Sequence, residues 1–192
     1  MAVTKKSKEQ IESIPSPDRD HYLRVTHVLY PFSGLDKIDP DVVAYAGARG
    51  TKVHRICEAI ISGLGEIGVE DETWGYVESF KKWWQLGLPV VEMEKRFWDD
   101  NLQLTGQLDL IIDTSDGLAI VDLKTSSNPS KTWAAQGSAY AYLAKQAGYN
   151  INKIFFLHLN KHGKVPKIYE YPVDDSFFLS VYRTYKHFFH KA

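Results

Sequence analysis

The chain has 192 residues, of which 44% are hydrophobic and 24% charged, and its formal net charge is −1. This length fits one globular domain with a sizeable core, and the charge balance excludes a protein that coats nucleic acid by bulk electrostatics. A single cysteine, Cys57, excludes a disulfide framework and an iron–sulfur cluster held by the cysteines of one chain. No apolar run approaches the roughly 20 residues that span a bilayer, and residues 1–12 lack the apolar segment of a signal peptide. We therefore expect an intracellular protein that has no membrane partner.

The expected elements follow from hydrophobic spacing, cap residues and turn residues. In chain order they are a flexible arm at 1–20, a short mixed segment at 23–31 with Thr26 as a helix cap, helices at 39–62 and 71–86, strands at 90–98, 103–113 and 118–124, a helix at 131–146, strands at 154–159 and 167–173, and a helix at 174–190. Turn residues at 99–101 and 115–117 indicate that the first three strands form an antiparallel meander. The order predicts an α/β fold with a mixed central sheet flanked by helices.

The triplet Asp122-Leu123-Lys124 ends the third expected strand. Because side chains alternate along a strand, Asp122 and Lys124 share one face, and Asp109 on the preceding strand can approach Asp122 from the side. Two close carboxylates repel each other unless a cation lies between them, and oxygen ligands suit Mg²⁺ or Mn²⁺. The carbonyl of Leu123 is a natural extra ligand. Lys124 can then orient or deprotonate an attacking water and offset charge on a phosphate.

A solvated strand face with a salt bridge is the alternative interpretation of this triplet. It is the better explanation for a single D-x-K motif in an arbitrary sequence. Here the charged residues follow an apolar stretch at 118–123 that should be buried, and charges at the end of a buried strand more often mark a site. The pattern therefore favours a metal-dependent site.

The helix after this strand carries Gln136 and Tyr140, which lie four residues apart and share one face. An amide and a phenol hydroxyl can both bond phosphate or sugar oxygens, and the ring can stack on a base. These side chains are therefore candidates for binding a nucleic-acid strand. Ordinary helix packing is the alternative, and we prefer it for the neighbouring Tyr142.

Two further side chains are candidates for the metal site. His54 begins a helical turn, and a neutral imidazole is a good ligand for a second metal ion. Because His54 shares a face with Cys57 and Ile61, a role in the core remains the alternative. Glu94 lies on the strand before that of Asp109 and is a candidate ligand, although a surface salt bridge would explain it equally well.

Four motifs in this order resemble the PD-(D/E)XK nuclease superfamily and, within it, the RecB-like branch. They are R-G-T-K-V-H at 49–54, G-Q-L-D at 106–109, V-D-L-K-T at 121–125 and Q-G-S-A-Y at 136–140. The resemblance implies a restriction-endonuclease-like core with a helical N-terminal elaboration, in a single nuclease domain at 21–192 whose helical part is 21–88 and whose catalytic core is 89–192. The implied roles are catalysis by Asp109, Asp122 and Lys124, metal binding by His54, Asp109, Asp122 and Leu123, and substrate binding by Gln136, Tyr140, Arg49 and Thr125.

Without a cysteine cluster, the chain is more similar to compact members such as phage exonucleases and the mitochondrial genome maintenance exonuclease. We expect a Mg²⁺- or Mn²⁺-dependent DNA exonuclease that prefers single-stranded ends and acts in DNA repair or recombination, for example in a phage-infected bacterium. The chain has no G-x-x-x-x-G-K-[ST] motif, so a separate helicase or recombination protein is an expected partner. Trp74, Trp83 and Trp84 could roof the site over a threaded strand or pack in the core. The alternatives are a structure-specific endonuclease with the same chemistry and an inactive nucleic-acid-binding module.

Overall fold

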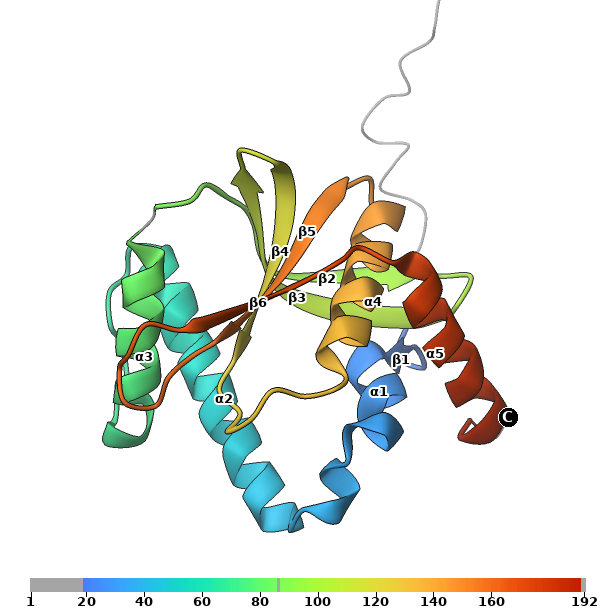
Figure 1. Ribbon diagram of the computed structural model, residues 1–192, viewed down its shortest axis with the longest axis horizontal. Helices are drawn as coiled ribbons and strands as arrows, with labels where there is room; N and C mark the ends of the chain where they lie inside the picture. Colours follow the sequence, from blue (N-terminus) through green and yellow to red (C-terminus); the bar gives the residue numbers. More distant parts are fainter. Residues whose placement is uncertain (1–18, 86, 191–192) are drawn as a thin grey trace, which may run out of the picture.

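The computed structural model describes residues 19–85 and 87–190 (Figure 1). In chain order the described residues form β1 (Leu23–Arg24), α1 (Val25–Ser33), the short 3₁₀ helix η2 (Leu35–Lys37), α2 (Pro40–Ile61), α3 (Asp71–Trp84), β2 (Val90–Asp99), β3 (Leu104–Thr114), β4 (Gly117–Lys124), α4 (Trp133–Gln146), β5 (Ile151–His158), β6 (Lys167–Tyr171) and α5 (Asp175–Phe188). The predicted α/β class with a mixed sheet flanked by helices is confirmed. Apart from Arg19 and Asp20, the predicted arm at 1–20 lies outside the described residues.

The strands of the described chain form one six-stranded sheet in the order β1-β3-β4-β5-β6, with β2 also paired to β3. Strands β2, β3 and β4 form the expected antiparallel meander. Strand β5 returns parallel to β4 after α4, and β6 pairs antiparallel with β5. The two-residue strand β1, which the sequence did not predict, pairs in parallel with the start of β3.

Two hydrophobic clusters pack against opposite faces of this sheet. Helices α1, α4 and α5 cover one face, and α2 and α3 cover the other (Figure 1). Gly137 lets α4 lie directly on β5, because a Cβ atom there would come within 2.5 Å of Ile154 Cγ2. The side chains of β4 alternate between the two clusters, so Val121 and Leu123 point toward α2 and α3, as the alternation predicts.

The ends of the helices show which local signals were reliable. Asp39 caps α2 through the N–H of Asp41, and Asp174 caps α5 through two backbone N–H groups, so both helices begin where the expected ranges at 39–62 and 174–190 start. The assignment of Thr26 as a cap was wrong, because α1 begins at Val25 and the extended β1 runs directly into it. Within the described residues, no helix has the length and apolar character needed to cross a bilayer.

Candidate active site

One edge of β3 is paired in two separate stretches with a gap between them. Strand β4 pairs with β3 from Leu110 to Thr114, and β1 pairs with Leu104 and Thr105. The G-Q-L-D motif at 106–109 occupies the gap, while β2 continues to pair along the other edge. The sheet therefore has room for functional side chains at the point where β3 and β4 separate.

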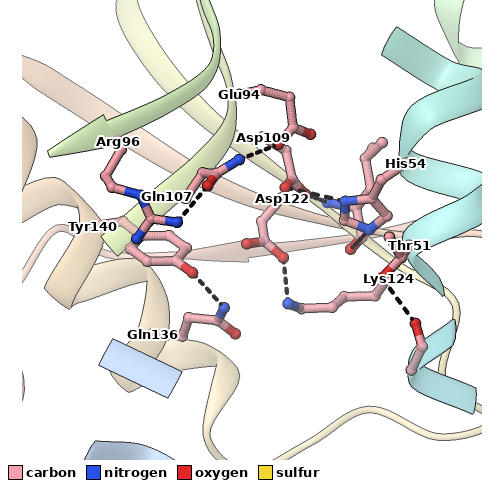
Figure 2. Close-up of polar contacts among 12 residues, drawn as sticks. Thr51, His54, Glu94, Arg96, Gln107, Asp109, Asp122, Lys124, Gln136 and Tyr140 are labelled. Carbon is pink, nitrogen blue, oxygen red and sulfur yellow. Dashed lines mark hydrogen bonds and ion pairs between the residues drawn. The ribbon is translucent and has the colours of Figure 1, made fainter. Parts of the chain in front are cut away.

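Asp109 lies at this point of separation, next to the end of the β3–β4 ladder. Its Oδ2 atom accepts a hydrogen bond from the backbone N–H of Leu123 at 2.6 Å, which holds the two strands in place beyond their last backbone pair. Asp122 lies beside Asp109 (Figure 2). Both carboxylates are buried, with 9% of Asp109 and 2% of Asp122 exposed. The structure thus brings these two predicted residues together in a setting that demands a compensating cation or proton.

Lys124 provides one such positive charge. Its Nζ atom forms an ion pair with Asp122 Oδ1 at 2.5 Å, as expected for side chains on the same face of β4. The ammonium group also lies 5.2 Å from the centre of the Phe156 ring. Lys124 therefore presents its charge to the carboxylates from a defined position between this ring and Asp122.

His54 reaches the same point from α2, on the helical layer that covers the sheet. Its Nδ1 atom lies 3.2 Å from Asp109 Oδ1, and Nε2 lies 3.1 Å from the carbonyl oxygen of Leu123. Burial disfavours the imidazolium form, but the charge and hydrogen bond of Asp109, together with the charge of Asp122, outweigh burial and raise the pKa of His54 to about 9. His54 therefore contacts two of the predicted metal ligands, Asp109 and the carbonyl of Leu123.

Glu94 completes the group from β2. It has a positive φ of 48°, a left-handed conformation that is rare for a residue with a side chain and that recurs at functional sites. His54, Glu94 and Asp109 each offer a ligand atom, and these atoms lie within 4.8 Å of one another. Burial, followed by the charge of Asp109, raises the pKa of Glu94. The strained backbone therefore directs a third carboxylate toward the other acidic groups.

The electrostatics of this site fit a divalent cation. Burial and the nearby Asp109 raise the pKa of Asp122 to about 6, although Lys124 opposes the shift. Burial also disfavours the ionised form of Asp109, but the charges of His54 and Lys124 outweigh it and lower the pKa of that carboxyl. Asp122 Oδ1 is buried, and its partner is the Lys124 ammonium group. A metal ion would offset the negative charge of the neighbouring carboxylates, and carboxylates and a carbonyl are the ligands that Mg²⁺ and Mn²⁺ favour.

The sequence matches the profile of the PD-(D/E)XK nuclease superfamily over residues 68–184, which is more than half of the chain. The chain belongs to this superfamily. Membership indicates a metal-dependent nuclease that acts on DNA. A search of curated proteins found no match. Among solved structures, the crystal structure of SSO0001 is 14% identical to this chain, with a TM-score of 0.50 over 93% of this chain and 80% of that one, which shows the fold alone.

In this nuclease Gln136 and Tyr140 meet as predicted, since Gln136 Nε2 donates to the Tyr140 hydroxyl at 2.9 Å. However, only 4% of Tyr140 is exposed. Its ring lies against Gly106 of β3, where a Cβ atom would come within 2.8 Å of a ring carbon. The predicted stacking of this ring on a base therefore does not fit the described conformation, and a side chain at position 106 would clash with the ring. The polar ends of Gln136 and Tyr140 face the acidic site (Figure 2).

A cleft of about 940 Å³ lies in front of the acidic site of this superfamily member. Its walls include Arg49 and His54 from α2, Leu35 from η2, and Lys124 and Thr125 at the end of β4. Arg49 Nη2 donates to the carbonyl oxygen of Thr125 at 3.1 Å, so this arginine also connects α2 to the residue that follows β4. Arg49 and Thr125, two of the four residues predicted to bind substrate, therefore border the cleft, whereas Gln136 and Tyr140 are not among its lining residues.

The tryptophans do not form its roof. Trp83 and Trp84 pack against Phe80 within the cluster below α3, and half-exposed Trp74 is on the same helix, outside the lining of the cleft. Helix α2 covers the site instead. The sequence reasoning also missed Gln107 and Arg96. Gln107 Nε2 donates to Glu94 Oε2 at 2.7 Å, and Arg96 donates to Gln107 Oε1 at 2.6 Å.

Proposed function

We propose that the chain is a metal-dependent deoxyribonuclease that digests DNA from single-stranded ends. The observation that carries this proposal is the convergence of Asp109, Asp122 and Lys124 at the separation of β3 and β4, with His54 and Glu94 beside them. A simple surface salt bridge would not bury two carboxylates side by side. It would also not require a strained glutamate opposite them.

Asp109, Asp122 and the Leu123 carbonyl would hold Mg²⁺ or Mn²⁺, with His54 and Glu94 available as further ligands. Such an ion activates a bound water and stabilises negative charge that develops on a phosphate. Lys124 would orient the attacking water and offset part of that charge. Gln136 and the Tyr140 hydroxyl would bond the strand near the scissile phosphate, and Arg49 and Thr125 would contact it along the cleft wall.

The preference for single-stranded ends is supported by the form of the cleft. Its lining runs from α1 and η2 across α2 to the end of β4, so helices form one side of the cleft. A strand bound in this cleft would lie between α2 and the end of β4, which favours a single strand with a free end. We also propose residues 21–192 as one nuclease domain and a separate helicase or recombination protein as the source of unwound DNA.

Linear and circular single-stranded DNA of the same sequence test this function. With Mg²⁺ or Mn²⁺ the linear strand should be digested and the circle should stay intact. Excess chelator should stop digestion of the linear strand with either metal. Ca²⁺ should support binding with little turnover, because its larger and looser coordination misplaces the water. Cleavage of the circle would favour the structure-specific endonuclease, and binding without cleavage in any metal would favour the inactive module.

A further inference from the structure

A second cavity of about 190 Å³ opens beside the catalytic cleft. It is lined by Arg24 from β1, Thr26 from α1, Arg96 from β2 and Gln107 from β3, with Tyr140 at its side. Thr26 and Gln107 line the cleft as well, so the two spaces adjoin each other. The cavity occupies the same gap on β3 as the acidic site, but at the end where β1 begins to pair.

The charged side chains that line this cavity are all positive, whereas those of the catalytic cleft are of both signs. Among the described residues, its lining holds two arginines and no acidic side chain. Arg96 contacts only the neutral amide oxygen of Gln107, at 2.6 Å, and Arg24 is exposed with no hydrogen bond or ion pair to any described residue. Helix α1 also begins here, without a side-chain cap or an acidic residue in its first turn, and so adds partial positive charge. Two guanidinium groups without acidic partners provide a binding site for an anion.

We propose that this pocket binds a phosphate group of the same DNA strand whose neighbouring bond is cleaved at the acidic site. The proposal rests on the proposed nuclease function, because a strand in the cleft would carry further phosphates past Thr26 and Gln107. Gln107 joins the two sites, since its amide accepts from Arg96 and donates to Glu94. A phosphate held by Arg96 is thereby fixed in position relative to a candidate metal ligand, which would set how far the strand advances before cleavage.

Binding of a labelled single-stranded oligonucleotide in chelator tests the pocket without relying on turnover. Replacing Arg24 and Arg96 together by alanine should weaken binding roughly tenfold. The slope of log K against log salt concentration should also become shallower by about 0.7 for each phosphate that the variant no longer binds. Arg96→Lys keeps the charge but loses the bidentate fork of the guanidinium group. Its affinity for the oligonucleotide should therefore lie between that of wild type and that of the double alanine variant. Lys95→Ala is the matched control, because Lys95 is the next residue on β2 and pairs at 3.4 Å with Glu92, away from the pocket.

Oligonucleotides with a 5′ phosphate, a 3′ phosphate or only hydroxyl ends distinguish the two sources of the phosphate. If the pocket holds a terminal phosphate, one of the phosphorylated strands should bind wild type more tightly than the hydroxyl strand, and the double variant should lose that difference. If it holds an internal phosphate, the double variant should lose affinity equally for all three strands. Both results support the pocket.

A double variant that matches Lys95→Ala in affinity and salt dependence for every strand would overturn the proposal. The experiment distinguishes this outcome from a failure of the proposed function. Continued metal-dependent cleavage by such a variant would leave the nuclease assignment in place without the pocket. Loss of binding in the double variant of a protein whose wild type never cleaves in metal would instead leave the pocket without the nuclease. Thermal unfolding of each variant checks that it has folded.

Discussion

Asp122→Asn should abolish DNA cleavage and yet make the metal-free protein more stable at neutral pH. In the absence of metal, Asp122 is buried beside Asp109, and its pKa rises from an ordinary 3.8 to about 6. A shift of this size corresponds to a cost of about 3 kcal/mol for the ionised form. Asparagine removes the negative charge but also the ion pair with Lys124. We therefore expect a net gain of about 1–2 kcal/mol in the free energy of unfolding.

The sign of this effect depends on pH. Above about pH 6 Asp122 is ionised in both the folded and the unfolded protein, so the full cost of its burial is present. As the pH falls through 6 toward 3.8 the folded protein takes up a proton first, and the cost disappears. The difference in stability between variant and wild type should thus be largest at neutral pH and vanish near pH 4. Urea unfolding in chelator at several pH values measures it.

In the presence of metal, wild type should become more stable than Asp122→Asn. An ion at about 100 times its dissociation constant stabilises a folded protein by roughly 2.7 kcal/mol, and Asp122→Asn loses part of that gain with its charged ligand. Asp113→Asn is the control, because Asp113 is an exposed carboxylate on the same sheet and should change neither stability nor activity. If Asp122→Asn were less stable than wild type in chelator at neutral pH, Asp122 would be a structural partner of Lys124, and the reasoning would be refuted.

Further substitutions separate chemistry, metal binding and packing. Lys124→Ala should lower the single-turnover cleavage rate by about 10²–10⁴-fold with an unchanged fold, and near-normal turnover would contradict its role. His54→Ala should raise the Mn²⁺ concentration needed for half-maximal activity, and excess Mn²⁺ should partly restore the rate; a loss of thermal stability alone would point to packing. Tyr140→Phe should keep stability but raise the substrate concentration for half-maximal rate, whereas Tyr140→Ala should cost about 3 kcal/mol in unfolding free energy. Gly75→Ala should lower stability by about 1–3 kcal/mol, because its Cβ would come within 1.8 Å of the Lys161 carbonyl oxygen, and unchanged urea midpoints would contradict that contact.

The sequence predicted the elements well where the signal was local. Alternation along β4 placed Asp122 and Lys124 on one face, and the turn residues between the first long strands gave the meander. The helices expected from residues 39 and 174 begin there, each with an aspartate at its N-terminal cap. In each case the deciding interaction joins residues close in the chain, so a short window of sequence contains it.

The structure of the site depends on contacts that a short window does not contain. The gap on β3 lies between the residues that pair with β1 and those that pair with β4. Strand β1 has only two residues, so it leaves no periodic pattern in the sequence from which this pairing could be predicted. The left-handed conformation of Glu94 has no sequence signal either, since glutamate rarely adopts it. The burial of Tyr140 depends on the absence of a side chain at Gly106, more than thirty residues earlier in the chain.

Gln107 illustrates how a motif can be found while the function of one of its members is missed. The pattern G-Q-L-D drew attention to its aspartate, because carboxylates bind metal and an exposed amide on a strand has no distinctive chemistry. The partners of that amide, Arg96 and Glu94, come from the neighbouring strand β2, and the register of β2 against β3 brings them together. The amide has both a donor and an acceptor, so it can bond a cation on one side and a carboxylate on the other. An aspartate or lysine at this position could serve only one of the two, which gives a physical reason for glutamine between the proposed phosphate pocket and the candidate metal site.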